Sequence, residues 1–195
     1  MIIDDLSGKI TAKWVEKNII QEEDQNLYTY GIKYGIVQAI HLIAMSIVGI
    51  LWGMFFEVII MMTAYIPLRM YAGGYHLQSS SKCFIFSILV LNIQLFVLKY
   101  AEIEHVLWIM GISSVLIMML APVQSPHNPL NRLEIKRHRQ TAIILVIIEA
   151  LFVIELYYGL CYYQMCSVIT MAVFTCSILL VIEKIRALTL RTVVE

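Results

Sequence analysis

Residues 34–68 form a nearly unbroken apolar run, and this run constrains the fold more than any other feature of the sequence. A helix that crosses a bilayer needs about 20 apolar residues, so the run is too long for a single span. We place a turn at Gly53, with Glu57 close to it, and expect one helix on each side. The second helix is short for a span, and a tilted or re-entrant helix would explain it equally well.

Further apolar segments follow along the chain. Together with the first two, the expected spans cover residues 34–52, 55–68, 83–98, 106–121, 141–158 and 164–182. The composition agrees, because 60% of the residues are hydrophobic and only 14% are charged, against about 25% charged in a soluble domain. We therefore predict an all-α, polytopic helix bundle in the lipid bilayer, with about six transmembrane helices.

The placement of basic residues predicts how the bundle is oriented. Lys and Arg concentrate in the cytoplasmic loops of membrane proteins. With six spans and both termini inside, only Lys99 of the fourteen Lys and Arg residues falls on the outer side. The sequence thus predicts a multi-pass protein of the cell membrane whose residues 69–83 face the cytoplasm. The net charge of zero, without a basic tract among aromatics, argues against nucleic acid as a partner.

We expect one integral-membrane domain over residues 1–195, with no internal repeat or low-complexity tract. Residues 1–33 would form a cytoplasmic amphipathic segment, residues 34–182 the bundle and residues 183–195 a cytoplasmic tail. The N-terminal segment has apolar residues at helical spacing, namely Ile3, Leu6, Ile10 and Trp14. This spacing suits a helix on the inner membrane surface, and it suits equally a solvated leader packed on the bundle.

The break between the second and third spans holds the residues best suited to chemistry. His76 and Cys83 lie seven residues apart in a segment rich in Gly and Ser. Of the other cysteines, Cys166 and Cys176 fall in the last span and Cys161 in an outer loop. Without a C-x-x-C pair or a histidine at zinc-ligand spacing, neither a metal nor another cofactor is expected.

Cys83 is expected at the start of the third span, after serines that suit a helix N-cap, Ser80 among them, and beside Lys82. A helix N-terminus and an adjacent cation both favour a thiolate over a thiol, which is the form of a cysteine nucleophile.

His76 would supply the base for this thiol. On one continuous helix, seven residues span about 10 Å along the axis, which is too far for a hydrogen bond. The pair therefore requires a bend, which Gly73 and Gly74 would provide. The spacing also leaves open a satisfied loop histidine beside a buried cysteine.

Arg69, then Ala72-Gly73-Gly74-Tyr75-His76, then Cys83 resemble the signature of the accessory gene regulator B (AgrB) family, membrane endopeptidases that process quorum-sensing pro-peptides. The resemblance extends to the length, the polar N-terminus, the six spans and the basic stretch of residues 132–139. The family often has an acidic residue near position 124 and a basic one near 128, where this chain has Gln124 and Asn128.

The resemblance implies a cysteine endopeptidase with Cys83 as nucleophile and His76 as general base and acid. The substrate would be a short AgrD-like precursor peptide, whose own thiol or hydroxyl then closes a thiolactone or lactone ring. Arg69 and Gly74 match motif positions and would shape the site, although Arg69 is explained equally well as a positive-inside anchor. A third catalytic residue is not identified, and a homodimer stays open.

Glu149 lies near the middle of the fifth expected span, where an ionisable residue is functional by default. We favour a structural hydrogen bond for it over a substrate contact, and we expect His41, Asn92 and Gln94 to join helices. Two other function classes stay open, a small polytopic peptide transporter and a non-enzymatic membrane anchor or sensor. A transporter is expected to have broken mid-membrane helices or a repeat between its halves, and the sequence has neither signal.

Overall fold

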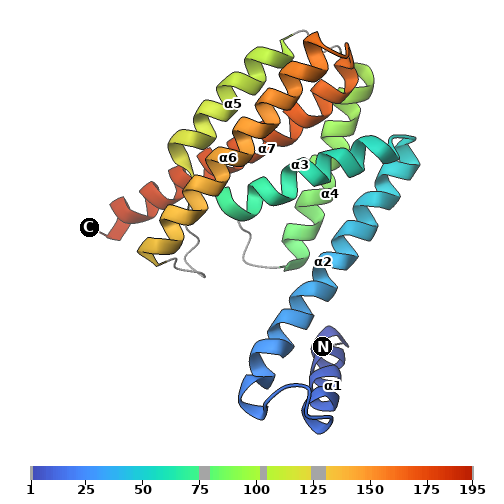
Figure 1. Ribbon diagram of the computed structural model, residues 1–195, viewed down its shortest axis with the longest axis vertical. Helices are drawn as coiled ribbons and strands as arrows, with labels where there is room; N and C mark the ends of the chain where they lie inside the picture. Colours follow the sequence, from blue (N-terminus) through green and yellow to red (C-terminus); the bar gives the residue numbers. More distant parts are fainter. Residues whose placement is uncertain (1, 75–79, 102–104, 124–130, 195) are drawn as a thin grey trace. The chain divides into compact units, whose positions relative to one another are not determined.

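The computed structural model describes residues 2–74, 80–101, 105–123 and 131–194. These ranges are almost entirely helical and contain no β-strand, which confirms the predicted all-α fold (Figure 1). The elements are α1 (Ile2–Glu16), the 3-10 turn η1 (Glu22–Asp24), α2 (Gln25–Trp52), α3 (Phe55–Ala72), α4 (Ser80–Tyr100), α5 (Val106–Leu120), α6 (Arg132–Tyr158) and α7 (Tyr163–Val194).

Within the described ranges, five helices are long and apolar enough to cross a membrane. They are Glu22–Trp52, Phe55–Ala72, Lys82–Tyr100, Arg132–Tyr158 and Tyr163–Ala187. The remaining apolar helix, α5, has 15 residues. At 1.5 Å per residue such a helix reaches only about 22 Å, less than the hydrocarbon core of about 30 Å. The remaining predicted span, residues 106–121, corresponds to α5, and it therefore stays a prediction.

The predicted turn at Gly53 is confirmed, because α2 ends at Trp52 and α3 begins at Phe55. Gly53 has a φ of +69°, a conformation that glycine adopts without steric cost. Side chains from α4 hold this end of α2. The Trp52 indole donates to Asn92 Oδ1 over 2.9 Å, and Lys99 Nζ donates to the Trp52 carbonyl over 3.2 Å.

Two helices extend well beyond their apolar segments. α6 begins at Arg132 rather than near residue 141, and α7 continues to Val194 rather than ending near residue 182. At the start of α6, the Asn131 side chain accepts from the Glu134 backbone amide and the Glu134 carboxylate accepts from the Asn131 amide, which together form a capping box. The Asn131 side chain also accepts from the Arg132 amide. Hydropathy locates the membrane-compatible part of a helix, whereas capping sets where the helix begins.

Residues 48–195 form one compact unit, built around α7. α7 packs against α3, α5 and α6, and it also contacts α4 (Figure 1). The core consists of buried side chains from α3, α5, α6 and α7. It includes the fully buried Leu68, Ile117, Val146, Val173 and Leu180. Gln94 of α4 donates to Thr175 Oγ1 over 2.5 Å and to the Met171 carbonyl over 3.3 Å. The predicted joining roles of Asn92 and Gln94 are thus confirmed, whereas His41 bonds to Val37 in its own helix.

Residues 1–47 form a second unit, of which residues 2–47 are described. Here α1 packs on the beginning of α2 through small polar residues, since Ser7 and Thr11 are fully buried and Thr11 Oγ1 lies 2.8 Å from Thr29 Oγ1. Lys33 pairs with Asp4, and this hydrogen-bonded ammonium lowers the pKa of the Asp4 carboxyl to about 2. The predicted apolar stripe is helical, but Leu6 within it is exposed, so the polar face makes the buried contact.

Candidate functional site

The candidate site is built on the end of α3. The Gly73 amide donates to the Arg69 carbonyl over 3.1 Å, and Arg69 Nη1 donates back to the Gly73 carbonyl over 2.5 Å. The last carbonyls of a helix lack partners within the helix, and a guanidinium with several donors is well suited to hold the chain that leaves it. Arg69 thus fixes the direction in which the chain exits α3.

Gly73 is also joined to a distant segment. It has a φ of +78° and forms an isolated parallel bridge with Val123, whose amide donates to the Ala72 carbonyl over 3.0 Å. A Cβ atom at Gly73 would lie 2.2 Å from the Val123 carbonyl oxygen. The position therefore needs glycine for two reasons, its backbone conformation and the close approach of the chain that follows α5.

Gly74 is buried and has a φ of +127°. A Cβ atom here would lie 1.6 Å from Arg69 Nη1, so the guanidinium rests directly against the Gly74 backbone. Arg69, Gly73 and Gly74 therefore form a single structural unit, which we call the Arg69 corner. The structure brings together these three residues of the predicted site.

Cys83 lies in the first turn of α4, which begins at Ser80. Its thiol is free and half-buried, and the neighbouring Lys82 is exposed. Cys166 and Cys176 are buried in the α7 core, and Cys161 is exposed in the turn between α6 and α7. Cys83 is therefore the cysteine that combines a helix N-terminus with partial access to solvent.

Two predicted features fall outside the described detail. His76, the predicted catalytic base, lies outside the described residues, and its pairing with Cys83 therefore stays a prediction. Ser80 is the first residue of α4, but its side chain is likewise not described. The roles of His76 and Ser80 stay predictions.

Tyr65 lies on α3, one helical turn before Arg69, and it was not among the predicted site residues. Its ring packs against the buried core from α3. The available signal was its position four residues before Arg69, which places both side chains on one helix face. Tyr65 therefore lies on the same face of α3 as Arg69.

Glu149 is half-buried on α6, and in the described part of the chain its Oε2 atom is buried without a hydrogen-bond partner. We expected a structural hydrogen bond for the Glu149 side chain, and within those ranges its Oε2 atom does not form one. The functional role of Glu149 therefore stays a prediction.

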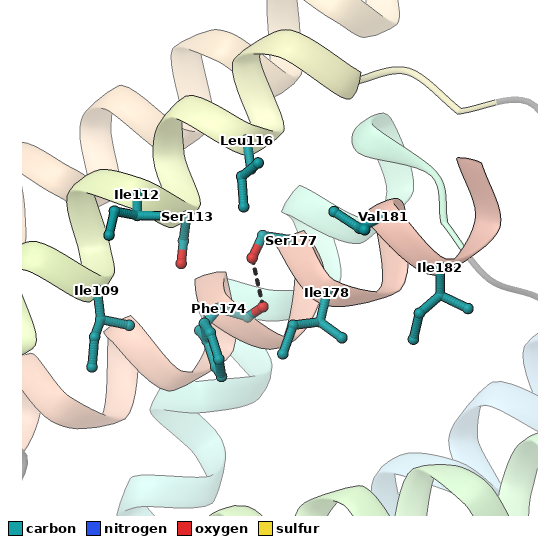
Figure 2. A pocket seen from close by; sticks show the side chains of 9 residues that line it. All are labelled: Ile109, Ile112, Ser113, Leu116, Phe174, Ser177, Ile178, Val181 and Ile182. Atoms are coloured by element: carbon teal, nitrogen blue, oxygen red, sulfur yellow. Dashed lines mark hydrogen bonds between the residues drawn. The ribbon is translucent and has the colours of Figure 1, made fainter. Parts of the chain in front are cut away.

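A groove of about 220 Å³ lies between α5 and α7, and none of the predicted site residues lines it (Figure 2). Its lining is apolar apart from Ser113 and Ser177, and the Ser177 hydroxyl donates to the Phe174 carbonyl of its own helix over 2.8 Å. None of its lining side chains titrates near neutral pH. This groove lacks the groups that acid-base or nucleophilic catalysis requires. In the described ranges, no group of three His, Cys, Asp or Glu residues is placed to hold a metal ion.

The comparisons with known proteins identify the family. The model of a family described as Accessory gene regulator B (AgrB) matches residues 7–183, which include the Arg69 corner and Cys83. No curated protein and no solved structure matches the chain. The match covers most of the chain, from α1 into α7, and agrees with the predicted resemblance. The chain belongs to the AgrB family.

Proposed function

We propose that this protein is a membrane-embedded cysteine endopeptidase that cleaves off the C-terminal part of a short AgrD-like precursor peptide. It then promotes cyclisation of the remaining N-terminal part. Family membership supports a role in the processing of quorum-sensing peptides. The observation that carries the finer proposal is the position of Cys83, a free, half-buried thiol in the first turn of α4.

The α4 N-terminus would assist the nucleophile. The first amides of a helix lack intrahelical partners and carry a partial positive charge. In the first turn of α4, these amides stabilise negative charge on the Cys83 sulfur and on a substrate oxygen beside it. Lys82 adds a further positive charge from an exposed position.

The reaction proceeds in two steps. In the first, the Cys83 sulfur attacks a peptide carbonyl carbon, a C–S bond forms and the C–N bond breaks as the His76 imidazolium gives its proton to the leaving amine. In the second, a thiol or hydroxyl of the precursor attacks the resulting thioester and passes its proton to His76. The ring closes, and Cys83 leaves as the thiolate, ready for another cycle.

The Arg69 corner would hold the substrate in place. Arg69 is fixed by the Gly73 carbonyl and the Gly74 backbone, so its positive charge has a defined position. A guanidinium in such a position binds a substrate carboxylate or orients the backbone of the site. A site at the membrane surface also limits the access of water, which would otherwise hydrolyse the thioester to a linear peptide.

The test of this proposal is processing of the precursor by purified protein in proteoliposomes. We expect Cys83→Ala and His76→Ala to abolish cleavage while membrane insertion is retained. Cys161→Ala and Cys166→Ala serve as matched controls and should process normally, because both cysteines lie away from the site. Cleavage by Cys83→Ala would refute the nucleophile, and peptide export that survives Cys83→Ser would favour a transporter.

The cytoplasmic location of the site has its own test, which uses the natural cysteines. Cys161 is exposed in the α6–α7 turn, Cys83 is half-buried, and Cys166 and Cys176 are buried. A membrane-impermeant maleimide added to intact cells should label Cys161 and leave Cys83 unmodified until the membrane is opened. Labelling of Cys83 in intact Cys161→Ala cells would contradict the cytoplasmic site.

A further inference from the structure

The side of α6 that faces the lipid is defined by its exposed and buried residues. Ala142 and Val153 are fully buried in the core, whereas Ile144 and Leu151 are more than half exposed. At about 100° per residue, Leu151 lies on the opposite side of the helix from Ala142. Since α6 is long and apolar enough to cross a membrane, its exposed apolar side contacts lipid.

Three polar residues continue this side beyond the apolar segment. Gln140, Arg137 and Lys136 are exposed, and they lie about 20°, 40° and 60° from Leu151 around the helix axis. Gln140 follows Lys136 by four residues and Arg137 by three, so it neighbours both on the helix surface. Lys136, Arg137 and Gln140 therefore share the lipid-facing side, and we call them the α6 basic cluster.

The other side of these turns is packed against the bundle. The His138 ring makes an edge-on contact with Tyr71 of α3, with 5.4 Å between the ring centroids. Arg139 is exposed but lies about 120° from Leu151, away from the α6 basic cluster. The contact between α6 and α3 thus fixes the direction in which the cluster faces.

The α6 basic cluster lies at the level of the phospholipid headgroups. Counted back from Thr141, where the apolar segment begins, its members lie about 2 to 8 Å outside that segment at 1.5 Å per residue. The headgroup layer on each side of a bilayer is about 5–8 Å thick. Long basic side chains at this depth extend to the phosphates.

The charge of the cluster is not neutralised by the described part of the chain. Neither Lys136 nor Arg137 has an ion-pair partner there. The nearby Glu134 carboxylate accepts instead from the Asn131 amide in the capping box. Two adjacent cations repel each other, and an anion from outside the chain would relieve that repulsion.

We infer that the α6 basic cluster is a binding site for the phosphate of an anionic phospholipid. The ammonium and guanidinium groups donate charge-assisted hydrogen bonds to phosphate oxygens, and the Gln140 amide adds a neutral donor. The acyl chains of the bound lipid then lie along the exposed apolar side of α6, at Ile144 and Leu151. This inference is independent of the proposed peptidase activity, because it concerns lipid binding alone.

The test is titration of the full-length protein in detergent with phosphatidylglycerol or with phosphatidylcholine of the same acyl chains. Native mass spectrometry counts the bound lipids. Arg137→Gln should weaken phosphatidylglycerol binding about fivefold and Lys136→Gln/Arg137→Gln about 10- to 30-fold, since each basic residue near anionic lipid contributes a comparable factor. Phosphatidylcholine binding should not change. Arg139→Gln, the matched control two residues away, should stay within about twofold of the unmodified protein.

A second readout is the stabilisation that bound lipid confers. Phosphatidylglycerol should raise the unfolding temperature of the unmodified protein more than that of Lys136→Gln/Arg137→Gln, and this measurement also shows that the variant is folded. Unchanged phosphatidylglycerol binding in the double variant would overturn the inference. An equal loss in Arg139→Gln would also overturn it, because diffuse attraction to all basic residues would then explain the binding. If the double variant binds this lipid normally but loses affinity for the precursor, the surface serves a peptide and the inference is wrong.

Discussion

α3 is bounded at both ends by glycines with positive φ, and the two ends differ in what surrounds those glycines. At the Gly53 end, a Cβ atom would meet no atom within 4 Å. At the other end, Cβ atoms at Gly73 and Gly74 would lie 2.2 Å from the Val123 carbonyl oxygen and 1.6 Å from Arg69 Nη1. The first end needs glycine for the turn alone, whereas the second needs it for contacts with other parts of the chain.

The interactions at the two ends differ in the same way. Near Gly53, side chains such as Gln164, which donates to Glu57 Oε1 over 3.0 Å, join the helices at an exposed position. At the Arg69 corner, backbone groups of α3 bond to the chain after α5, and a buried glycine lies under a guanidinium. We expect the Gly53 end to tolerate change and the Arg69 corner to control both stability and activity.

The largest effect is expected for Gly73→Ala. Its backbone conformation, with φ of +78° and ψ of −150°, is essentially restricted to glycine. A Cβ atom would also collide with backbone that cannot move independently. The free energy of unfolding should fall by roughly 3 kcal/mol or more, and processing should be lost. Thermal unfolding in detergent and the proteoliposome assay measure both, and near-normal values would show that the Val123 contact is unimportant.

Gly74→Ala should affect activity more than stability. The obstructing atom is the end of the flexible Arg69 side chain, so the guanidinium would move and the fold would persist at a cost of about 1–2 kcal/mol. With Arg69 displaced, processing should fall about 100-fold. In an Arg69→Ala background, the same Gly74→Ala change should add little to the loss. Additive losses in this double-mutant cycle would mean that the two positions act separately.

Gly53→Ala provides the matched comparison at the opposite end of α3. It introduces the positive-φ strain of an alanine, about 1–2 kcal/mol, without a steric clash. The unfolding temperature in detergent should fall slightly, and processing per folded molecule should be unchanged. A loss of processing as large as that of Gly74→Ala would break the distinction between the two ends.

The smallest effect is expected for Gln164→Ala. It removes the hydrogen bond to Glu57, which is exposed and therefore contributes about 0.5–1.5 kcal/mol at most. Unfolding measurements should detect a small change, and processing should be normal. A drop in processing without loss of folded protein would show that the Gly53 end communicates with the site.

The sequence predicts the features of this protein that depend on local pattern. Apolar segments locate the helices, and a glycine next to an acidic residue locates the turn at Gly53. Cys83 was correctly expected at a helix start because serines precede an apolar run. These features were predictable since hydropathy and turn chemistry act within a few residues.

Other features depend on contacts between distant residues and were not predictable. The bridge between Gly73 and Val123 joins segments that follow different helices, and no local pattern encodes it. The α1–α2 contact likewise uses Ser7 and Thr11, although the apolar stripe of α1 gave the stronger sequence signal. Tertiary packing selected the polar face of that helix.

The measurement that tests the central claim most directly is capture of a thioester on Cys83. A precursor whose internal cysteine or serine nucleophile is replaced by alanine cannot close its ring, so the acyl-enzyme should accumulate. We expect an adduct with the added mass of the N-terminal precursor fragment, released by hydroxylamine and absent in Cys83→Ala. If the cyclic product forms normally from the unmodified precursor while no hydroxylamine-sensitive adduct is captured in a single turnover, Cys83 is not the acyl carrier and the account is wrong.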